Sequence, residues 1–156
     1  MASRWPDNWE KRVTGEECSV CAAVRTDAPY GDPVIFQSRW TVATLRRHDI
    51  QRGYAVVAWR DGHVVEPLDL PDDAAAAYWA DVLRVARAVR MHFRPKKLNF
   101  ETLGNTEPHL HTHIVPRYDE DPNPGGNFPF WLVEDPPLLP VDAVAGDAEA
   151  LRALLS

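Results

Sequence analysis

The chain has 156 residues, of which 45% are hydrophobic and 26% charged, and its formal net charge is −6 at pH 7. This length is enough for one hydrophobic core and short for two domains, and the composition excludes a disordered chain, a collagen or a coiled coil. The acidic balance gives no general attraction to nucleic acids or anionic membranes, so a phosphate site has to be positive locally.

Residues 1–17 are polar, carry two tryptophans and are expected to form an N-terminal arm. They contain no signal-peptide segment, and no apolar run in the chain approaches the ~20 residues that cross a bilayer, so we expect a cytoplasmic protein. The arm leads into Cys18 and Cys21, which are the two cysteines of the chain. In a chain without an export signal, their C-x-x-C spacing indicates metal binding or redox chemistry rather than a disulfide framework.

Three β-prone runs follow the cysteines. Residues 34–37 and 40–45 are separated by Ser38 and Arg39 and predict a hairpin. Residues 54–59 are apolar enough for a central strand.

A long amphipathic helix is predicted from about Pro71 to about Phe93. Pro71 suits a first helical turn, Asp72 and Asp73 complement the helix dipole, and Pro95 ends the helix. Its arginines recur at three- and four-residue spacing and are interpreted as the solvated face rather than as a nucleic-acid surface: Arg84, Arg87, Arg90 and Arg94.

Two further strands are predicted at residues 97–103 and 109–116, and their connection at residues 104–108 is short enough for antiparallel neighbours. The tail that follows is rich in proline and must lie over a surface, because prolines at this density cannot form an inner strand. A short helix is expected from about Val141 to Leu155.

The most informative segment is the last predicted strand, in which His109, His111 and His113 alternate. Strand periodicity places the three histidines on one face, opposite Leu110, Thr112 and Ile114. Three buried imidazoles would each need a partner, at a cost of ~1–3 kcal/mol for every unpaired group, so the strand indicates a site rather than core filling. The pattern by itself also allows a zinc centre with a further ligand from elsewhere.

Residues 109–115 resemble the signature of the histidine triad (HIT) family, His-φ-His-φ-His-φ-φ with φ apolar, and Thr112 is the one imperfect φ position. The flanking residues 98–108 and 116–118 are similar to prokaryotic members, and a weaker resemblance extends from Cys18 to about Pro129.

This resemblance implies a nucleotide phosphate hydrolase or nucleotidyl transferase in which His111, the middle histidine, attacks the α-phosphate. A neutral imidazole is a competent nucleophile near neutral pH, and the product would be a nucleotidyl-histidine. By the same matching, His113 contacts phosphate, while the main-chain carbonyl of His109 accepts a hydrogen bond from one nitrogen of His111. Candidate substrates are dinucleoside polyphosphates, nucleoside phosphoramidates and similar nucleotide conjugates.

The matching polar positions of the family make four residues candidate substrate ligands: Asn99, Asn105, Thr106 and Arg117. Asn105 follows Gly104 and has an alternative role in the turn, and Arg117 has an alternative role at the end of the strand.

Two positions depart from the family. Tyr54 stands where many members have histidine after a glycine, and Arg46 falls near the acidic or amide residue that typically holds the ribose. Arg46 could therefore select a substrate with more phosphate.

Some members of the family bind zinc through a set of residues that here corresponds to Cys18, Cys21, His63 and His109. Two thiolates and two imidazoles suit tetrahedral zinc, and four protein ligands leave no position for a catalytic water, so such a zinc is structural. A redox pair or two unpaired thiols are the alternatives for the cysteines. No organic cofactor is expected.

The expected fold is α+β and HIT-like, with a five-stranded antiparallel sheet, a long helix packed on it, helices on one side and a two-fold dimer. The HIT domain is expected over residues 18–130, with a C-terminal extension at 131–156. The apolar helix and the tail exceed what one short sheet needs, which also favours a homodimer. The alternatives in function are a metal-dependent hydrolase that uses the histidine strand as ligands and a nucleotide-binding module without turnover. The expected partners are a nucleotide and a second copy of the chain, without nucleic acid or membrane.

Overall fold

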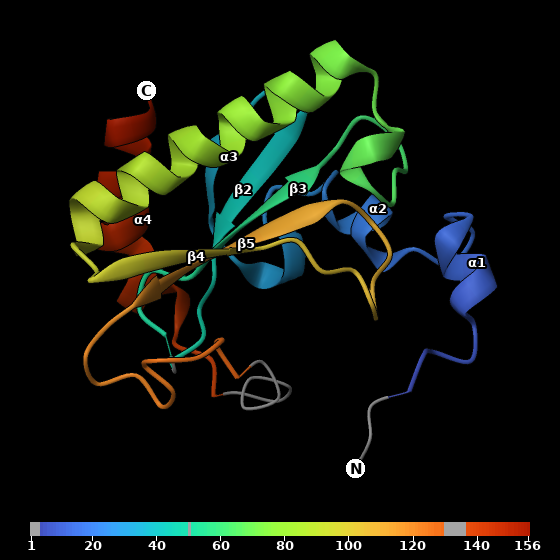
Figure 1. The fold of residues 1–156 in the computed structure, drawn as a ribbon. Coiled ribbons are helices and arrows are strands. Elements are labelled where there is room, and N and C mark those ends of the chain that lie inside the picture. The colour runs from blue at the N-terminus through green and yellow to red at the C-terminus, as the bar shows by residue number, and fades with distance from the viewer. Residues whose placement is uncertain (1–3, 50, 130–136) are drawn as a thin grey trace.

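The computed structural model describes residues 4–49, 51–129 and 137–156, and an antiparallel sheet of five strands forms its centre (Figure 1). The strands are β1 (Val34–Gln37), β2 (Thr41–Leu45), β3 (Ala55–Trp59), β4 (Lys97–Glu101) and β5 (His111–Arg117). Their spatial order is β1-β2-β3-β5-β4, so that β5 lies inside the sheet and β4 forms one edge. The predicted hairpin, β1 with β2, and the predicted antiparallel pair, β4 with β5, are confirmed.

The histidine strand begins at His111, two residues later than the sequence predicted. The N–H of His109 donates to the carbonyl of Glu107 across a turn, at 2.8 Å. Leu110 then bonds to the segment after β3: its N–H donates to the carbonyl of Val64, and its carbonyl accepts from the N–H of Trp59. His109 therefore lies just before the strand, held by the connection from β4.

The long helix α3 (Asp72–Phe93) packs against one face of the sheet. Its buried face contributes Tyr78, Val82, Val85 and Val89, each of which is fully buried. The helix ends at Phe93, and the next residue, Arg94, has a left-handed backbone (φ 51°) and precedes Pro95. The predicted helix and its end are therefore confirmed.

A second helix, α4 (Val141–Leu155), lies on the same face beside α3 and β1 (Figure 1). Val144, Leu151 and Leu155 belong to the main hydrophobic core together with α3 and the sheet. The predicted helix is present, and it is an integral part of that core. The expected boundary between residues 130 and 131 lies outside the described residues.

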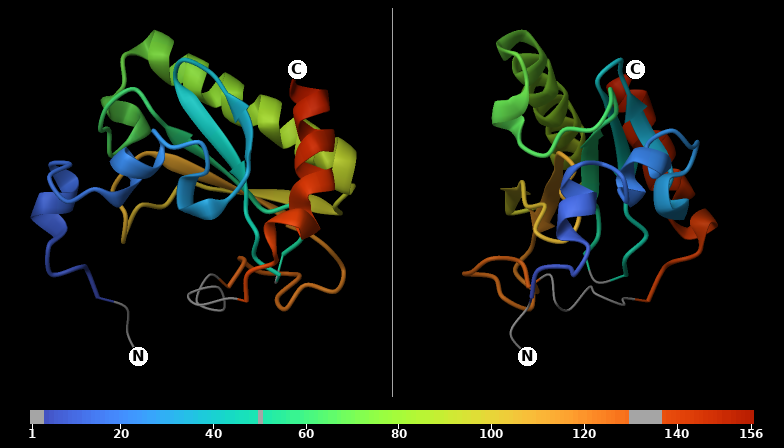
Figure 2. Two further views of the ribbon diagram at one scale, coloured as in Figure 1. Left: turned by 180° about the vertical axis from the view of Figure 1, so that it is seen from behind. Right: turned by 90° about the vertical axis from the view of Figure 1, so that its right-hand side faces the viewer.

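The opposite face of the sheet carries two short elements, α2 (Ser19–Ala23) and the turn η1 (Pro29–Gly31). The short helix α1 (Trp9–Val13) lies to the side of the sheet (Figure 1), and a further turn, η2 (Pro67–Asp69), precedes α3. Val20 and Val24 pack against Val42 and Ala58, in a small cluster separate from the main core. The expectation of helices on one side was therefore wrong for α2 (Figure 2). Strands β2 and β3 are apolar on both faces, and both faces need a cover. Among the described residues, no helix is long and apolar enough to span a membrane.

Candidate active site

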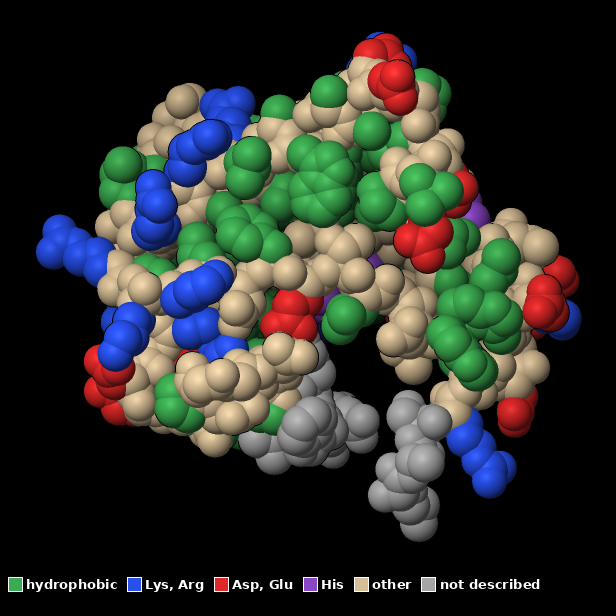
Figure 3. All heavy atoms as spheres, in the orientation of Figure 1, with side chains coloured by type: hydrophobic (Ala, Val, Ile, Leu, Met, Phe, Trp, Pro, Cys, Tyr) green, Lys and Arg blue, Asp and Glu red, His purple; other side chains and the backbone are tan. Residues whose placement is uncertain are grey.

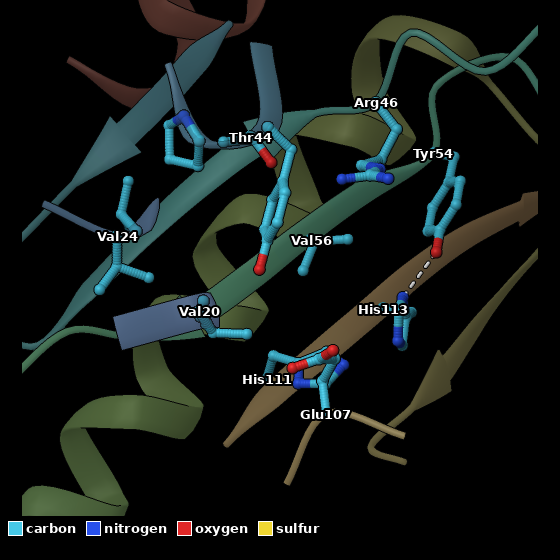
Figure 4. A pocket seen from close by; sticks show the side chains of 13 residues that line it. Val20, Val24, Thr44, Arg46, Tyr54, Val56, Glu107, His111 and His113 are labelled. Carbon is cyan, nitrogen blue, oxygen red and sulfur yellow. Dashed lines mark hydrogen bonds between the residues drawn. The ribbon is translucent and has the colours of Figure 1, made fainter. Parts of the chain in front are cut away.

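A cavity of about 190 Å³ lies between α2, η1 and the face of the sheet that α3 leaves open (Figure 4). One part of its wall is apolar and comes from Val20, Val24, Pro29, Val42, Val56 and Ala58. The rest carries the chemistry and comes from Tyr30, Thr44, Arg46, Tyr54, Glu107, His111 and His113. An apolar slot with polar groups gathered on one side is the usual form of a small-molecule site.

His111 faces this cavity with one ring nitrogen fixed. Its Nδ1 lies 2.5 Å from the carbonyl oxygen of His109. A carbonyl can only accept a hydrogen bond, so Nδ1 carries the proton and Nε2 keeps its lone pair. Burial also lowers the pKa of His111 below its ordinary value, which favours the neutral ring. His111 therefore has a lone pair on Nε2, and such a nitrogen can act as a nucleophile.

His113 lies next along the strand, and its ring centroid is 4.8 Å from that of His111. Burial lowers the pKa of His113 to about 3, so its imidazole is neutral at physiological pH. The phenol oxygen of Tyr54 lies 2.6 Å from Nδ1 of His113, as the dashed line in Figure 4 marks.

Gly53 sets the position of Tyr54 at the start of β3. Its backbone has φ +81°, which side chains rarely adopt, and a Cβ added there would lie 2.6 Å from the ring of Phe93. Glycine is therefore required at this turn. The strand that follows directs Tyr54 to the same face as Val56, which pairs with His113 in the neighbouring strand.

The first triad histidine belongs to a second group of polar side chains. This group has four ligand atoms within 4.8 Å of one another, one each from Cys18, Cys21, His63 and His109. Nδ1 of His109 lies 3.4 Å from the sulfur of each cysteine, and Nδ1 of His63 lies 3.3 Å from Cys21. The structure thus unites all four residues that the resemblance named, His63 included, in one cluster that could hold a metal ion.

The surroundings of the cluster fit a metal. Nε2 of His109 donates to the carbonyl of Trp59, at 2.8 Å, and Nε2 of His63 donates to Val13, at 2.9 Å. Both rings therefore turn an unprotonated Nδ1 toward the cysteines, as the outer partners of metal-bound histidines do. Without a cation, burial and the neighbouring Cys18 raise the pKa of Cys21 to about 11. A bound cation would reverse this effect and favour the thiolates.

The four candidate substrate ligands are not among the residues that line the cavity. Arg117 is buried, and its guanidinium holds the loop after β5 by an ion pair to Asp121 and by hydrogen bonds to the carbonyls of Asn123 and Gly126. It also donates to the side chain of Asn99. These two residues support the end of the strand and the following loop.

Asn105 and Thr106 lie on the connection before the triad, in a shallow hollow shared with Arg4 and Trp5 of the N-terminal arm. The carbonyl of Thr106 accepts a hydrogen bond from Arg12 of α1, at 2.9 Å. In this structure both residues therefore lie apart from the cavity, and their contact with substrate stays a prediction.

Arg46, which departs from the family pattern at the expected ribose position, lines the cavity. It forms an ion pair of 2.8 Å with Asp32, which is almost completely buried, and Arg47 lies 3.7 Å from the same carboxylate. Burial raises the pKa of Asp32 despite the two arginines. Two guanidinium groups on one carboxylate leave positive charge at this end of the cavity.

The sequence did not reveal the apolar wall that α2 forms, or that Glu107 lines the cavity. Glu107 lies in the same loop as Asn105, and its carboxylate accepts hydrogen bonds from Arg12 at 2.5 Å and from Ser19 at 3.1 Å. The available signal for the wall was Val20 inside the C-x-x-C segment, together with strands that are apolar on both faces. These signals predict burial, but they do not show that a cavity remains between the helix and the sheet.

The fold and the site together are those of a histidine triad protein. The model of the HIT domain matches residues 30–120, which is more than half of the chain, and the chain therefore belongs to the HIT family. Among curated proteins, the chain is 29% identical to "Protein hit" of Bacillus subtilis over 108 residues, which cover 66% of this chain and 72% of that protein. It is 25% identical over 92 residues to bis(5'-adenosyl)-triphosphatase of Saccharomyces cerevisiae, covering 56% of this chain and 45% of the yeast protein.

Solved structures share the same fold. A histidine triad protein from Bradyrhizobium japonicum superposes with a TM-score of 0.69 at 25% identity, covering 80% of this chain and 91% of that one. A zinc-bound histidine triad family protein from Mycobacterium smegmatis superposes with a TM-score of 0.63 at 25% identity, covering 90% of this chain and 94% of that one.

Proposed function

We propose that this chain is a nucleotide phosphate hydrolase or nucleotidyl transferase that works through a covalent nucleotidyl-histidine at His111. The observation that carries the proposal is the hydrogen bond from His111 Nδ1 to the carbonyl of His109, because it leaves Nε2 unprotonated at the cavity. The membership in the HIT family and the dinucleoside triphosphatase activity in the name of the yeast relative support the same class of reaction.

The reaction has two steps. In the first, the lone pair of His111 Nε2 forms a bond to the α-phosphorus, and the bond from phosphorus to the leaving oxygen or nitrogen breaks with its electron pair. In the second, a water oxygen attacks the phosphorus, the P–N bond breaks, and its electron pair returns to His111 while the water loses a proton. An acceptor other than water would give nucleotidyl transfer.

The two parts of the cavity wall suit the two parts of a nucleotide. The apolar side, formed by α2 and the cavity-lining face of β2 and β3, can cover a nucleobase. The cationic and imidazole groups lie on the other side, where phosphates would be held. Dinucleoside polyphosphates and nucleoside phosphoramidates both present a phosphorus bonded to such a nucleoside.

The substitution His111→Ala tests the proposal. We expect it to abolish turnover of a panel of nucleotide substrates, while circular dichroism shows an unchanged fold. His92→Ala is a matched control, because His92 lies on α3 and pairs with Asp147. Quenching the wild-type enzyme with an α-labelled substrate should leave acid-labile, base-stable label on the peptide that contains His111. A variant His111→Ala with near wild-type kcat would overturn the proposal.

The geometry favours this mechanism over a hydrolase that binds its metal through the histidine strand. In the described part of the chain, the grouped metal ligands include His109 but neither His111 nor His113. Brief treatment with chelator should therefore leave the initial rate intact. A rate that falls at once and returns with added metal would support the alternative.

We further propose that Cys18, Cys21, His63 and His109 bind one structural zinc ion. The paired thiols, the two inward-facing imidazole nitrogens and the outer carbonyls of Trp59 and Val13 support this assignment. The zinc would fix α2 and the start of the histidine strand to each other, away from the attacking nitrogen.

We also propose that the chain forms a homodimer through α3 and the edge strand β4. Large apolar side chains are exposed here: Trp79 and Leu83 on α3, Phe100 on β4, and Leu103 just after β4. Figure 3 shows apolar side chains gathered on the face formed by these elements. An exposed apolar patch next to an unpaired strand edge is typical of a protein interface.

A further inference from the structure

Tyr54 and His113 meet across two neighbouring strands, on the cavity face of the sheet. Tyr54 directly precedes β3, and the register that pairs Val56 with His113 makes Tyr54 the diagonal neighbour of His113. The phenol oxygen lies 2.6 Å from Nδ1 of the imidazole, and both side chains line the cavity (Figure 4).

The direction of this hydrogen bond follows from the chemistry of its partners. A phenol O–H is a better donor than a neutral imidazole N–H, and an imidazole nitrogen is a better acceptor than a phenol oxygen. Burial raises the pKa of Tyr54 well above its ordinary value and lowers that of His113 to about 3, so that both groups are neutral. Tyr54 therefore donates to Nδ1, and the imidazole carries its proton on Nε2.

His113 thus has the opposite tautomer to His111. Nδ1 of His111 is occupied by its proton and the carbonyl of His109, which leaves Nε2 free to attack. The two rings are neighbours, with centroids 4.8 Å apart. His111 thus has a lone pair on its Nε2, whereas His113 has an N–H on its own Nε2.

We propose that Tyr54 is a positioning residue that fixes His113 in its Nε2–H tautomer and so makes it a hydrogen-bond donor to an oxygen of the phosphoryl group. The proposal rests on the proposed function, since the phosphoryl group is the one that His111 would attack. A neutral donor of fixed direction stabilises the charge that grows on the phosphoryl oxygens without a proton having to move. Nothing in this role requires His113 to become charged.

The test compares Tyr54→Phe with Tyr118→Phe in the full chain. Tyr54→Phe removes the hydroxyl and keeps the ring. Tyr118→Phe is the matched control, because its hydroxyl donates to the carbonyl of Arg52 at 3.0 Å and it does not line the cavity. Long-range ¹⁵N NMR of histidine-labelled protein, assigned with His113→Asn, reports which nitrogen of His113 carries the proton.

In the wild type and in Tyr118→Phe, we expect the Nε2–H tautomer of His113. In Tyr54→Phe we expect a mixture of both tautomers and a kcat about tenfold lower with little change in KM, which corresponds to about 1.4 kcal/mol in the barrier. A wild-type His113 with its proton on Nδ1, or an unchanged tautomer in Tyr54→Phe, would overturn the inference. Absence of nucleotide turnover in the wild type would instead overturn the proposed function, because the NMR result does not depend on turnover.

Discussion

At the scale of single residues, Arg46 gives a local positive charge to a protein whose net charge is −6. Asp32 lies beneath it, almost fully buried, and Arg47 shares the same carboxylate. One carboxylate cannot neutralise two guanidinium groups, so positive charge remains beside His111 and His113. This charge suits a substrate whose phosphate chain continues beyond the α-phosphate, and Arg46 would bind that chain.

We therefore predict that Arg46→Gln reduces kcat/KM for a dinucleoside tetraphosphate by about tenfold, equivalent to about 1.4 kcal/mol, and reduces it much less for a nucleoside phosphoramidate. The reason is that the tetraphosphate carries more negative charge toward Arg46. Steady-state kinetics on the two substrates measure the difference.

Arg46→Lys and Arg39→Gln are the controls for this prediction. The lysine keeps the charge beside Asp32, so it should retain most of the preference. Arg39 is exposed on the turn between β1 and β2, away from the cavity, and its replacement should change neither substrate. Equal losses for both substrates in Arg46→Gln would contradict a role in selecting the longer phosphate chain.

The sequence predicted some of the site residues and not others, and the reason is physical. His111 could be located because alternation on a strand fixes which side chains share a face. For Arg117, the sequence left open a substrate contact or a role at the end of the strand, because strand periodicity does not encode the path of the loop that binds its guanidinium. Tyr54 stood out as a departure from the family, yet its contact with His113 depends on the register of two strands that are distant in sequence.

At the scale of secondary structure, α2 has little apolar support for an element that lies against the cavity. It has five residues, and its cluster contains only Val20, Val24, Val42 and Ala58 among the buried residues. A helix this short is not stable without tertiary contacts. The proposed zinc at the cysteine and histidine cluster would add the tertiary support that this small apolar contact does not supply alone.

We predict that removing zinc lowers the melting temperature of the protein more than it lowers the initial catalytic rate. The proposed zinc would hold α2 against the residues just before β5, whereas His111, the proposed nucleophile, is not one of the four residues of the cluster. Elemental analysis should find about one zinc per chain, and calorimetry with and without chelator measures the stability. Cys21→Ser should lose the metal, whereas Ser19→Ala in the same helix should retain it. Carefully prepared protein without metal would contradict the prediction.

Helix α4 shows the limit of sequence patterns at this scale. Its position and ends were predicted, but it was expected to be an extension, because an amphipathic pattern shows that a face is covered without showing by what. In the structure that face packs on α3 and β1, and Leu151 is completely buried. The C-terminal helix should therefore contribute directly to global stability.

We predict that Leu151→Ala lowers the free energy of unfolding by about 2–5 kcal/mol, the range for large cavities in well-packed cores. Leu154→Ala is the matched control on the same helix, because Leu154 is 44% exposed, and we expect a change below about 0.5 kcal/mol. Urea unfolding followed by circular dichroism measures both. If Leu151→Ala were as stable as the control, α4 would not be part of the cooperative core.

At the scale of the whole molecule, the two faces of the sheet have different covers, and the β4 edge pairs with no further strand among the described residues. Helices α3 and α4 cover one face, while α2, η1 and the cavity occupy the other (Figures 1 and 2). Strand β4 forms an edge of the sheet with Phe100 45% exposed on it. Next to it, α3 exposes Leu83 and Trp79. A second copy of the chain that places the same elements against these would cover both the apolar patch and the edge in one two-fold interface.

The final prediction is that the wild-type protein is a dimer at micromolar concentrations and that Phe100→Lys shifts it to the monomer. A lysine in the patch replaces apolar contact with a charge, and charges on strand edges oppose pairing between strands. Light scattering after size exclusion measures the mass in solution. Leu68→Lys is the control, because Leu68 on η2 is 81% exposed and lies outside the patch, so this variant should stay dimeric. Circular dichroism of Phe100→Lys must show an intact fold, since an unfolded variant would also lose its partner. A wild-type mass equal to that of one chain would contradict the dimer itself. A Phe100→Lys variant that remains folded and has the mass of a dimer would contradict an interface at β4.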